Sequence, residues 1–220
     1  MGFSPSGKVS RRFTVHSTST LAPVSTPSAA SGKPSVWRTS IRFTIVTTIL
    51  LGIGYPLLVT GIAEAVFPHK AAGSLILKDG QVIGSELLAQ SFTSDKYFHP
   101  RPSAAGNGYD ATSSGGSNLA QSNKTLVDRI QGSIDKLSQE NPGHPVPIDL
   151  VTTSGSGLDP DITPDAAYFQ IPRVAKARGL SEDRTHQIIE EHITKRQLGF
   201  LGEPRVNVLD LNLDLDKVAK

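Results

Sequence analysis

One uninterrupted apolar segment near the N-terminus dominates the hydrophobic pattern of this chain. Residues 43–63, FTIVTTILLGIGYPLLVTGIA, include 21 consecutive positions without a charge. At about 1.5 Å per residue such a helix is about 31 Å long, enough to cross the hydrocarbon core of a bilayer. The segment is longer than the apolar region of a cleaved signal peptide and begins later in the chain. With its flanks, it predicts a retained transmembrane anchor over residues 36–67.

The predicted anchor contains several small residues and one proline. Small residues let a second helix approach closely, and proline distorts a helix unless the freed carbonyl finds another donor. A distortion is therefore expected near Gly52, one turn before the proline. The residues predicted to pack against partner helices are Gly52, Gly54, Tyr55, Pro56 and Gly61.

Beyond the anchor, helical and strand-like periodicities are mixed, which predicts an α+β fold class. The expected elements are a hairpin over residues 74–84 turning at Asp79-Gly80, a short helix over 86–92, a helix over 119–137, a strand over 146–153, two short helices beginning at Thr163-Pro164 and separated at Pro172, a helix opened by Ser181, and a strand over 206–216. The prediction is a single N-terminal transmembrane helix followed by one mixed α+β domain over residues 68–220.

Residues 99–118, HPRPSAAGNGYDATSSGGSN, are too rich in Gly, Pro and Ser for regular structure. Loops of this length inside a compact domain are usually functional or disordered. The polar side chains of this loop either contact a partner or ligand, or satisfy the backbone groups that irregular structure leaves unpaired. The candidate residues are His99, Arg101, Tyr109, Asp110 and Asn118.

The charges flanking the anchor predict its orientation. Six of the 22 basic residues precede the span and no acidic residue does, the first being Glu64. Cationic flanks remain in the cytoplasm. Residues 1–35 are accordingly expected to form a disordered basic cytoplasmic tail, with the domain on the extracytoplasmic side. The basic residues are Lys8, Arg11, Arg12, Lys33, Arg38 and Arg42.

Several kinds of chemistry find no support in the sequence. The chain has no cysteine, which excludes disulfides and thiolate sites. It also lacks the G-x-x-x-x-G-K-[ST] loop of many nucleotide hydrolases and the G-x-S-x-G elbow of serine hydrolases. No catalytic residue, metal ligand or nucleic-acid partner is therefore predicted. A membrane-anchored hydrolase using His99 and a stand-alone binding domain remain the alternatives.

Two sets of polar residues have a spacing that resembles metal ligands. Glu182, His186 and Glu190 share one face of a predicted helix and are expected to be solvated. A second set alternates with Val and Leu and is expected to form the wet face of an edge strand. Its members are Asp210, Asn212, Asp214 and Asp216.

Long irregular motifs resemble a known family over roughly residues 38–217. They are Tyr55-Pro56, YFHPRPSAAGNGYD (97–110), SSGGSN (113–118), PIDLVTTSGSGLDPDITPDAA (147–167), RVAKARGL (173–180) and LGEPRVNVLDLNLDLD (201–216). The chain thereby resembles the C subunits of bacterial Kdp potassium-transporting P-type ATPases (KdpC).

This resemblance implies a non-catalytic accessory subunit of a high-affinity potassium uptake complex in the inner membrane. The implied partners are the channel-like KdpA, the ATP-hydrolysing KdpB, the small KdpF and the lipid bilayer. The implied roles are assembly and stability of the complex, and action as a catalytic chaperone that raises the affinity of KdpB for ATP. The charge pattern, by contrast, predicts no firmly bound cofactor, because a domain outside the cell does not meet cytoplasmic ATP.

Overall fold

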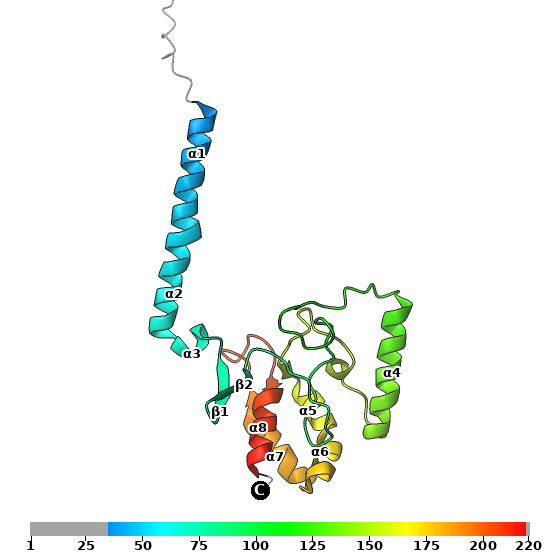
Figure 1. Ribbon diagram of the computed structural model, residues 1–220. Helices are drawn as coiled ribbons and strands as arrows, with labels where there is room; N and C mark the ends of the chain where they lie inside the picture. Colours follow the sequence, from blue (N-terminus) through cyan, green and yellow to red (C-terminus); the bar gives the residue numbers. More distant parts are fainter. Residues whose placement is uncertain (1–34, 219–220) are drawn as a thin grey trace, which may run out of the picture. The chain divides into compact units, whose positions relative to one another are not determined.

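The computed structural model describes residues 35–218, so the tail predicted to be disordered lies almost wholly outside the described residues. The chain divides between Gly54 and Tyr55 into two compact units. Figure 1 shows the helices and strands of each unit in sequence colours. Together they make one long apolar helix and a mixed α+β domain, which confirms the predicted fold class.

The N-terminal helix runs over 31 residues, Val36–Val66, and is long and apolar enough to cross a membrane. It consists of α1 (Val36–Thr47), a π-helical segment η1 (Thr48–Gly54) and α2 (Tyr55–Val66). The π-helical turns end just before Tyr55-Pro56, where a distortion was expected. A wider turn accommodates a proline, which has no N–H to donate and whose ring crowds the preceding turn.

A short hairpin begins shortly after the apolar helix, as predicted. It follows α3 (Pro68–Ala71) and pairs β1 (Leu75–Lys78) with β2 (Gln81–Ser85) in antiparallel register. The turn residues Asp79 and Gly80 both have positive φ, 52° and 78°. This conformation explains why Asp-Gly is found here, because few other residue pairs adopt it without strain.

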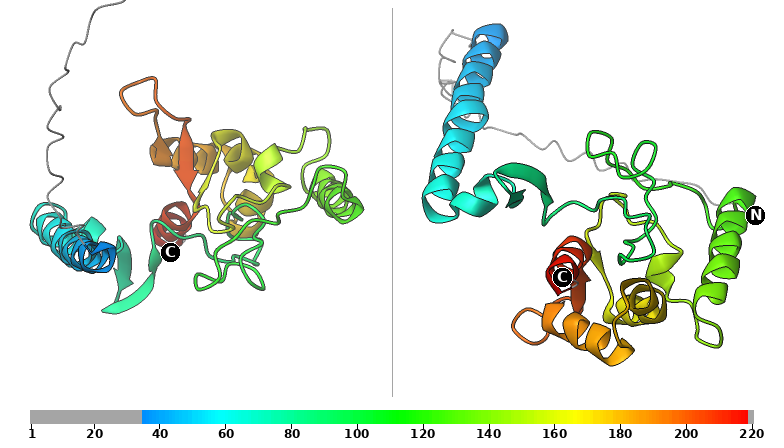
Figure 2. Two further views of the ribbon diagram at one scale, coloured as in Figure 1. Left: turned by 90° about the horizontal axis from the view of Figure 1, so that it is seen from above. Right: turned by 60° about the horizontal axis from the view of Figure 1, so that its bottom comes forward.

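The centre of the domain is a small antiparallel sheet covered by helices. Its strand order is β3-β5-β4, and Val206 pairs with Ile162 on one side and with Ile193 on the other. The strands are β3 (Asp161–Ile162), β4 (Ile193–Thr194) and β5 (Arg205–Asn207). Figure 2 shows from two further directions how the helices gather around these strands.

Three of the covering helices begin close to where the sequence predicts. Thr163 caps α5 by accepting a hydrogen bond from the Ala166 N–H, and Ser181 caps α7 in the same way from Arg184. A break before Pro172 separates α5 from α6, and Gly179 ends α6 with a φ of 67°. The helices are α5 (Pro164–Phe169), α6 (Ile171–Arg178) and α7 (Glu182–His192).

The hydrophobic core lies where these helices meet β5 and the last helix, α8 (Val208–Val218). One core side chain, Phe98, directly precedes the irregular segment over residues 99–118 and is completely buried. Other fully or almost fully buried members are Val174, Ile188, Ile189, Val206, Leu211 and Leu215. The residue just before the irregular segment thus anchors the start of that segment to the core.

The prediction of a strand over residues 206–216 is wrong after Asn207, because the helix α8 begins at Val208. Asn207 stops the strand by accepting hydrogen bonds from the N–H groups of Leu209 and Asp210 on its side-chain oxygen. Val208, Leu211 and Leu215 then recur at helical spacing and are buried. The prediction that this segment has a wet polar face including Asn212 is also wrong there, because Asn212 is only 1% exposed.

Two other predicted elements are also wrong. Residues 146–153 contain only the 3₁₀ turn η2 (Ile148–Leu150), since a strand cannot form readily around Pro145 and Pro147. Residues 86–92 form no helix, and the Ala89 N–H instead donates to the distant Leu158 carbonyl.

The helix predicted over residues 119–137 exists with shifted limits, as α4 (Lys124–Glu140). It begins at Lys124 because the side chain of Asn123 accepts the Thr125 N–H and caps the helix. None of its residues is fully buried, and it contacts the core mainly through Leu137.

Candidate functional site

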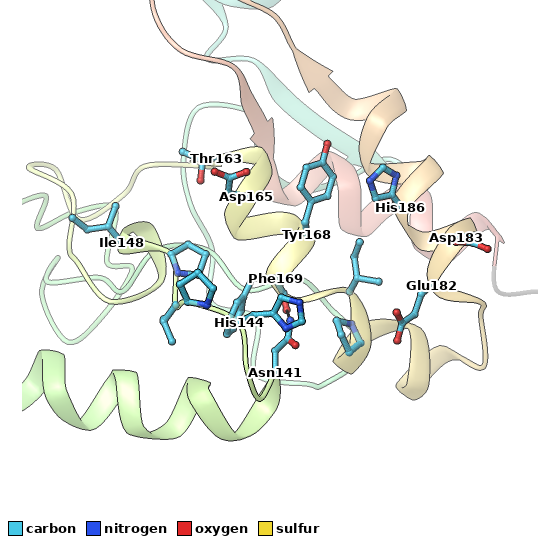
Figure 3. A pocket seen from close by; sticks show the side chains of 15 residues that line it. Asn141, His144, Ile148, Thr163, Asp165, Tyr168, Phe169, Glu182, Asp183 and His186 are labelled. Carbon is cyan, nitrogen blue, oxygen red and sulfur yellow. Dashed lines mark hydrogen bonds between the residues drawn. The ribbon is translucent and has the colours of Figure 1, made fainter.

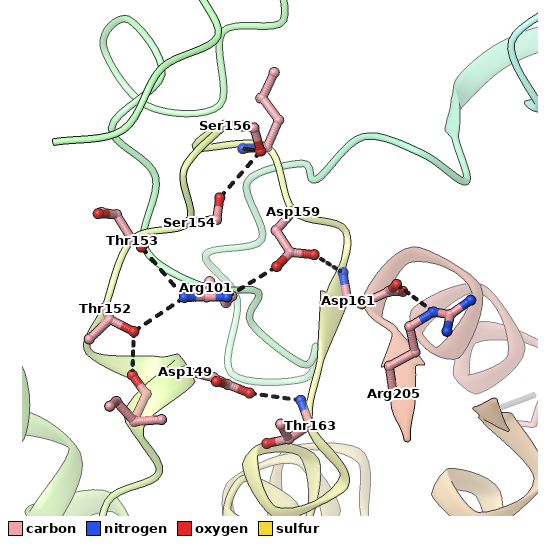
Figure 4. A network of polar contacts seen from close by, with 12 residues as sticks. Arg101, Asp149, Thr152, Thr153, Ser154, Ser156, Asp159, Asp161, Thr163 and Arg205 are labelled. Atoms are coloured by element: carbon pink, nitrogen blue, oxygen red, sulfur yellow. Dashed lines mark hydrogen bonds and ion pairs between the residues drawn. The ribbon is translucent and has the colours of Figure 1, made fainter. Parts of the chain in front are cut away.

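Arg101 lies at the centre of a polar network that fastens the irregular loop to the turn over residues 152–159 (Figure 4). Its guanidinium pairs with Asp159 at 3.1 Å and donates to the Thr152 hydroxyl and the Thr153 carbonyl at 3.3 and 3.4 Å. The Tyr109 hydroxyl in turn donates to the Arg101 carbonyl at 2.8 Å. Two of the predicted loop residues therefore act together to hold backbone in place.

The same turn is packed tightly against the loop backbone. Gly157 has a φ of 67°, and a Cβ atom there would lie 2.6 Å from the Gly115 carbonyl oxygen and 2.7 Å from the Ala105 nitrogen. The Ser103 hydroxyl donates to the Gly157 carbonyl at 2.6 Å and accepts the Tyr109 N–H at 2.8 Å. The long Gly- and Ser-rich loop is thus an ordered part of the domain.

The side chain of Gln170 holds His99 in place through the backbone of His99. The side-chain amide of Gln170 accepts the His99 N–H at 2.8 Å and donates to the His99 carbonyl at 3.2 Å. The imidazole Nε2 lies 3.2 Å from the Ser94 carbonyl oxygen. Burial, together with the nearby positive charge of Arg173, lowers the pKa of His99 below its usual value.

Asp110 and Asn118 lie outside this network. The Asp110 carboxylate accepts hydrogen bonds from the hydroxyl and then the backbone N–H of Thr112, which lower its pKa. Asn118 is exposed and has a positive φ of 51°. Among the five loop residues, all within the described chain, no two side chains hydrogen bond to each other, so they do not form a nucleophile–base pair.

A cavity of about 670 Å³, not foreseen from the sequence, opens beside the helices α5, α6 and α7 (Figure 3). Its wall contains Tyr168 and His186, whose rings are stacked 4.7 Å apart and almost parallel. The Tyr168 hydroxyl donates to Glu190, and burial with this carboxylate raises the pKa of Tyr168 to about 12. Phe169 contributes apolar surface.

The charge of this cavity restricts what it can hold. Three carboxylates line it, from Asp165, Glu182 and Asp183, and all three residues are exposed. The lining includes no lysine or arginine. An acidic, partly apolar cavity suits a neutral or cationic group and repels a phosphate. The expectation that Glu182, His186 and Glu190 are solvated is confirmed, but two of them also line this cavity.

Residues 35–218 offer few side chains for a metal site or an anion site. No group of three or more His, Asp or Glu side chains in this part of the chain is arranged to hold a metal ion. Two arginines with largely buried side chains already have ion-pair partners, since Arg173 pairs with Glu140 and Arg178 with Asp216. Arg178 also donates to the carbonyls of Lys96 and Leu215.

The predicted helix-packing residues all lie on exposed parts of the N-terminal helix. Gly52 and Gly54 belong to the π-helical segment, whereas Tyr55, Pro56 and Gly61 belong to α2. A Cβ atom at Gly61 would meet nothing within 4 Å. The described residues therefore leave this position open for a neighbouring helix.

Fold and sequence together define a class of protein: a single α+β domain carried on one helix that is long and apolar enough to cross a membrane. The model of the KdpC family, described as the K+-transporting ATPase c chain, matches residues 37–217. The chain therefore belongs to the KdpC family.

Its relatives are similar over most of their length. The potassium-transporting ATPase KdpC subunit of Koribacter versatilis is 56% identical over 178 residues, covering 81% of this chain and 92% of that protein. The subunits of the same name from Rhodopseudomonas palustris and Methylobacterium nodulans are 55% and 50% identical. The matches cover 81% and 83% of this chain, and 96% of each relative. The resemblance inferred from the motifs is thereby confirmed.

Proposed function

We propose that this chain is a non-catalytic accessory subunit of a potassium-transporting ATPase, required for assembly and stability of the complex. The observation that carries the proposal is the match to the KdpC family over residues 37–217. The helix Val36–Val66 is long and apolar enough to cross a membrane. A single span cannot enclose an ion pathway by itself, which supports a role within an assembly. The proposed partners are KdpA, KdpB and KdpF.

The proposed orientation places the N-terminus in the cytoplasm and the domain outside, at the inner membrane. Its support is the six basic residues before the span and the absence of any acidic residue there. In this orientation the domain covers the extracellular potassium entrance of the complex. It meets no cytoplasmic nucleotide directly.

With the domain outside the cell, this chain can act as a catalytic chaperone of KdpB only indirectly, without contacting ATP. The cavity beside Tyr168 is lined by three carboxylates and no lysine or arginine, so it would repel a triphosphate. We therefore propose that any effect of this chain on the ATP affinity of KdpB is transmitted through the assembly, without a bound ATP on this subunit.

Affinity purification of the full chain from mild detergent tests membership of the complex. Co-elution of large hydrophobic subunits and a potassium-stimulated ATPase activity are expected. Stable, monodisperse behaviour of the chain alone, with no co-eluting subunits from cells that express the complex, contradicts the proposal. ATP affinity of the assembly with and without this chain tests the chaperone role separately.

Cysteine labelling in intact cells tests the orientation, because the natural chain has no cysteine. Ser138 is exposed on α4 and has the size of cysteine, so Ser138→Cys is expected to react with a membrane-impermeant maleimide. Ser17→Cys, before the span, serves as the matched inside control and is expected to react only after permeabilisation. The reverse result places the domain in the cytoplasm.

A further inference from the structure

The loop between β4 and β5, residues 195–204, ends in a tightly closed tip. Gln197 and Leu201 exchange two backbone hydrogen bonds of 2.9 Å each, and Arg196 pairs with Glu203 below them. The Phe200 N–H donates to the Gln197 carbonyl at 3.2 Å. The tip is therefore a defined turn, and Figure 2 shows this loop projecting from the helices beside it.

Leu198 is an unfavourable residue for the backbone conformation of this turn. Leu198 and Gly199 have φ values of 53° and 82°, and positive φ at both central positions is the signature of a type I′ turn. Asn-Gly is the preferred pair for such a turn, whereas a leucine with positive φ is strained. Strain of this kind persists where the geometry itself serves a function.

The same residues are also a poor choice for a surface in water. Leu198 is 83% exposed and Phe200 is 69% exposed, with Leu201 beside them at 48%. A polar turn would remove both the strain and the exposed apolar surface. The tip thus combines two unfavourable features, and a contact outside the domain accounts for both.

The size of the tip restricts the nature of its partner. A phenylalanine buries roughly 150–250 Å², and a stable interface buries about 800 Å² on each partner. Two or three side chains at a tip do not hold a free protein or a second copy of this chain. They do contribute when the partner is already held close by, because tethering in one complex raises the effective concentration.

The geometry favours a protein over a lipid surface. A fluid bilayer accepts apolar side chains in any arrangement and gains nothing from a strained turn. A protein pocket does discriminate shape, and apolar anchors seated in pockets dominate interface energies. The loop carries Lys195 and Arg196 against Glu203, an excess of one positive charge, which suits a neutral or acidic rim around the pocket.

We propose that Leu198 and Phe200 dock as a rigid knob into an apolar pocket on another subunit of the same membrane complex. This inference rests on the proposed assembly with partner subunits but not on which side of the membrane the domain lies. It assigns an interaction surface to the 195–204 loop that is separate from the helix-packing residues of the anchor.

Leu198→Asn tests the proposal because it is expected to affect the stability of the chain and its binding to partner subunits differently. Asparagine suits the turn, so the unfolding midpoint of the full chain is expected to stay the same or to rise. Recovery of partner subunits from detergent is expected to fall about tenfold or more, the value for losing one well-buried leucine. The matched control is Val127→Asn, which removes an exposed apolar side chain from α4 and is expected to leave recovery unchanged.

Undiminished recovery with Leu198→Asn overturns the inference while the proposed function stands. A wild-type chain that recovers no partner subunits instead contradicts the proposed function, and this inference with it. The two failures are therefore distinguishable in one experiment. A fall in the unfolding midpoint of the variant shows a structural role and also overturns the inference.

A fluorescent reporter at the tip identifies the kind of surface. Trp37 is the only tryptophan, so Phe200→Trp in a Trp37→Phe background carries one emitter. Its emission is expected to be that of an exposed indole in the isolated chain and to shift to the blue in the complex, with protection from iodide. Quenching by lipids brominated on their acyl chains indicates insertion in the bilayer and overturns the inference, as does an indole that stays exposed in the complex.

Discussion

The side-chain amide of Asn212 pairs with both backbone groups of Phe98. Its oxygen accepts the Phe98 N–H at 2.8 Å and its nitrogen donates to the Phe98 carbonyl at 2.9 Å. Gln170 does the same for the next residue, His99. Two amides thus supply the hydrogen bonds that a neighbouring strand would supply, and irregular backbone can enter the core at low cost.

Asn212→Leu is expected to lower the free energy of unfolding by about 2–6 kcal/mol. The substitution preserves size but leaves a buried N–H and a buried C=O unpaired, each costing about 1–3 kcal/mol. Denaturant unfolding of the full chain in detergent, followed by circular dichroism, measures the loss. Asp210→Asn on the same helix is the control, and an equal effect of the two variants would contradict the role of the Phe98 contact.

Gly157→Ala is expected to be strongly destabilising, by at least about 2 kcal/mol, because it combines a positive φ with two backbone clashes. Gly155, two residues earlier, has open space around a Cβ atom and is absent from the positive-φ positions. Gly155→Ala is therefore the matched control and should be neutral. Thermal unfolding compares them, and similar midpoints for the two variants would show that the loop does not pack on this turn.

The stability of the domain is expected to depend on pH through His99. Its pKa is lowered in the folded chain, chiefly by burial and then by Arg173, although the Ser94 carbonyl and Glu140 oppose the shift. The unfolded chain therefore binds more protons, so this contribution to stability is present above about pH 6.5 and is lost as the pH falls through that value toward the folded pKa.

The unfolding midpoint, measured from pH 8 to pH 5, tests this dependence. His99→Gln is expected to flatten the part of the profile that begins near pH 6.5. His144→Gln, an exposed histidine at the rim of the acidic cavity, should reproduce the wild-type slope. A wild-type slope retained by His99→Gln would assign the pH dependence to other groups.

Gly61→Leu is expected to reduce recovery of partner subunits several-fold without lowering the stability of the chain. The position is open in the isolated chain, so any penalty must come from a neighbouring helix that approaches there. Ala63→Leu, about 200° around the helix, is the control and should recover partners normally. Equal recovery for Gly61→Leu and wild type would remove Gly61 from the predicted packing face.

Part of the candidate site was visible in the sequence. Arg101 and Tyr109 were recognised from a polar set in a loop too irregular for regular structure, and the structure joins them through the Arg101 carbonyl. Asp110 and Asn118 were selected by the same reasoning, although they lie apart from that network. The cavity beside Tyr168 was missed because its lining comes from separate segments, with only the spacing of Glu182 and His186 as a signal.

The sequence alone determined features that depend on local chemistry. A run without charges determines an apolar helix, Asp79-Gly80 determines a turn, and Thr163 or Ser181 followed by acidic residues determines a helix start. Each of these depends on residues a few positions apart, so neighbouring side chains suffice to specify it.

Only the tertiary structure decided whether residues 206–216 form a strand or a helix. Val and Leu alternating with Asp and Asn fit both a strand and one face of a helix, because positions 208, 211 and 215 satisfy a helical spacing as well. Contacts distant in sequence resolve the ambiguity: Asn212 is buried because its partner, Phe98, lies 114 residues earlier. Burial of a polar side chain depends on such a partner, and local sequence does not specify one.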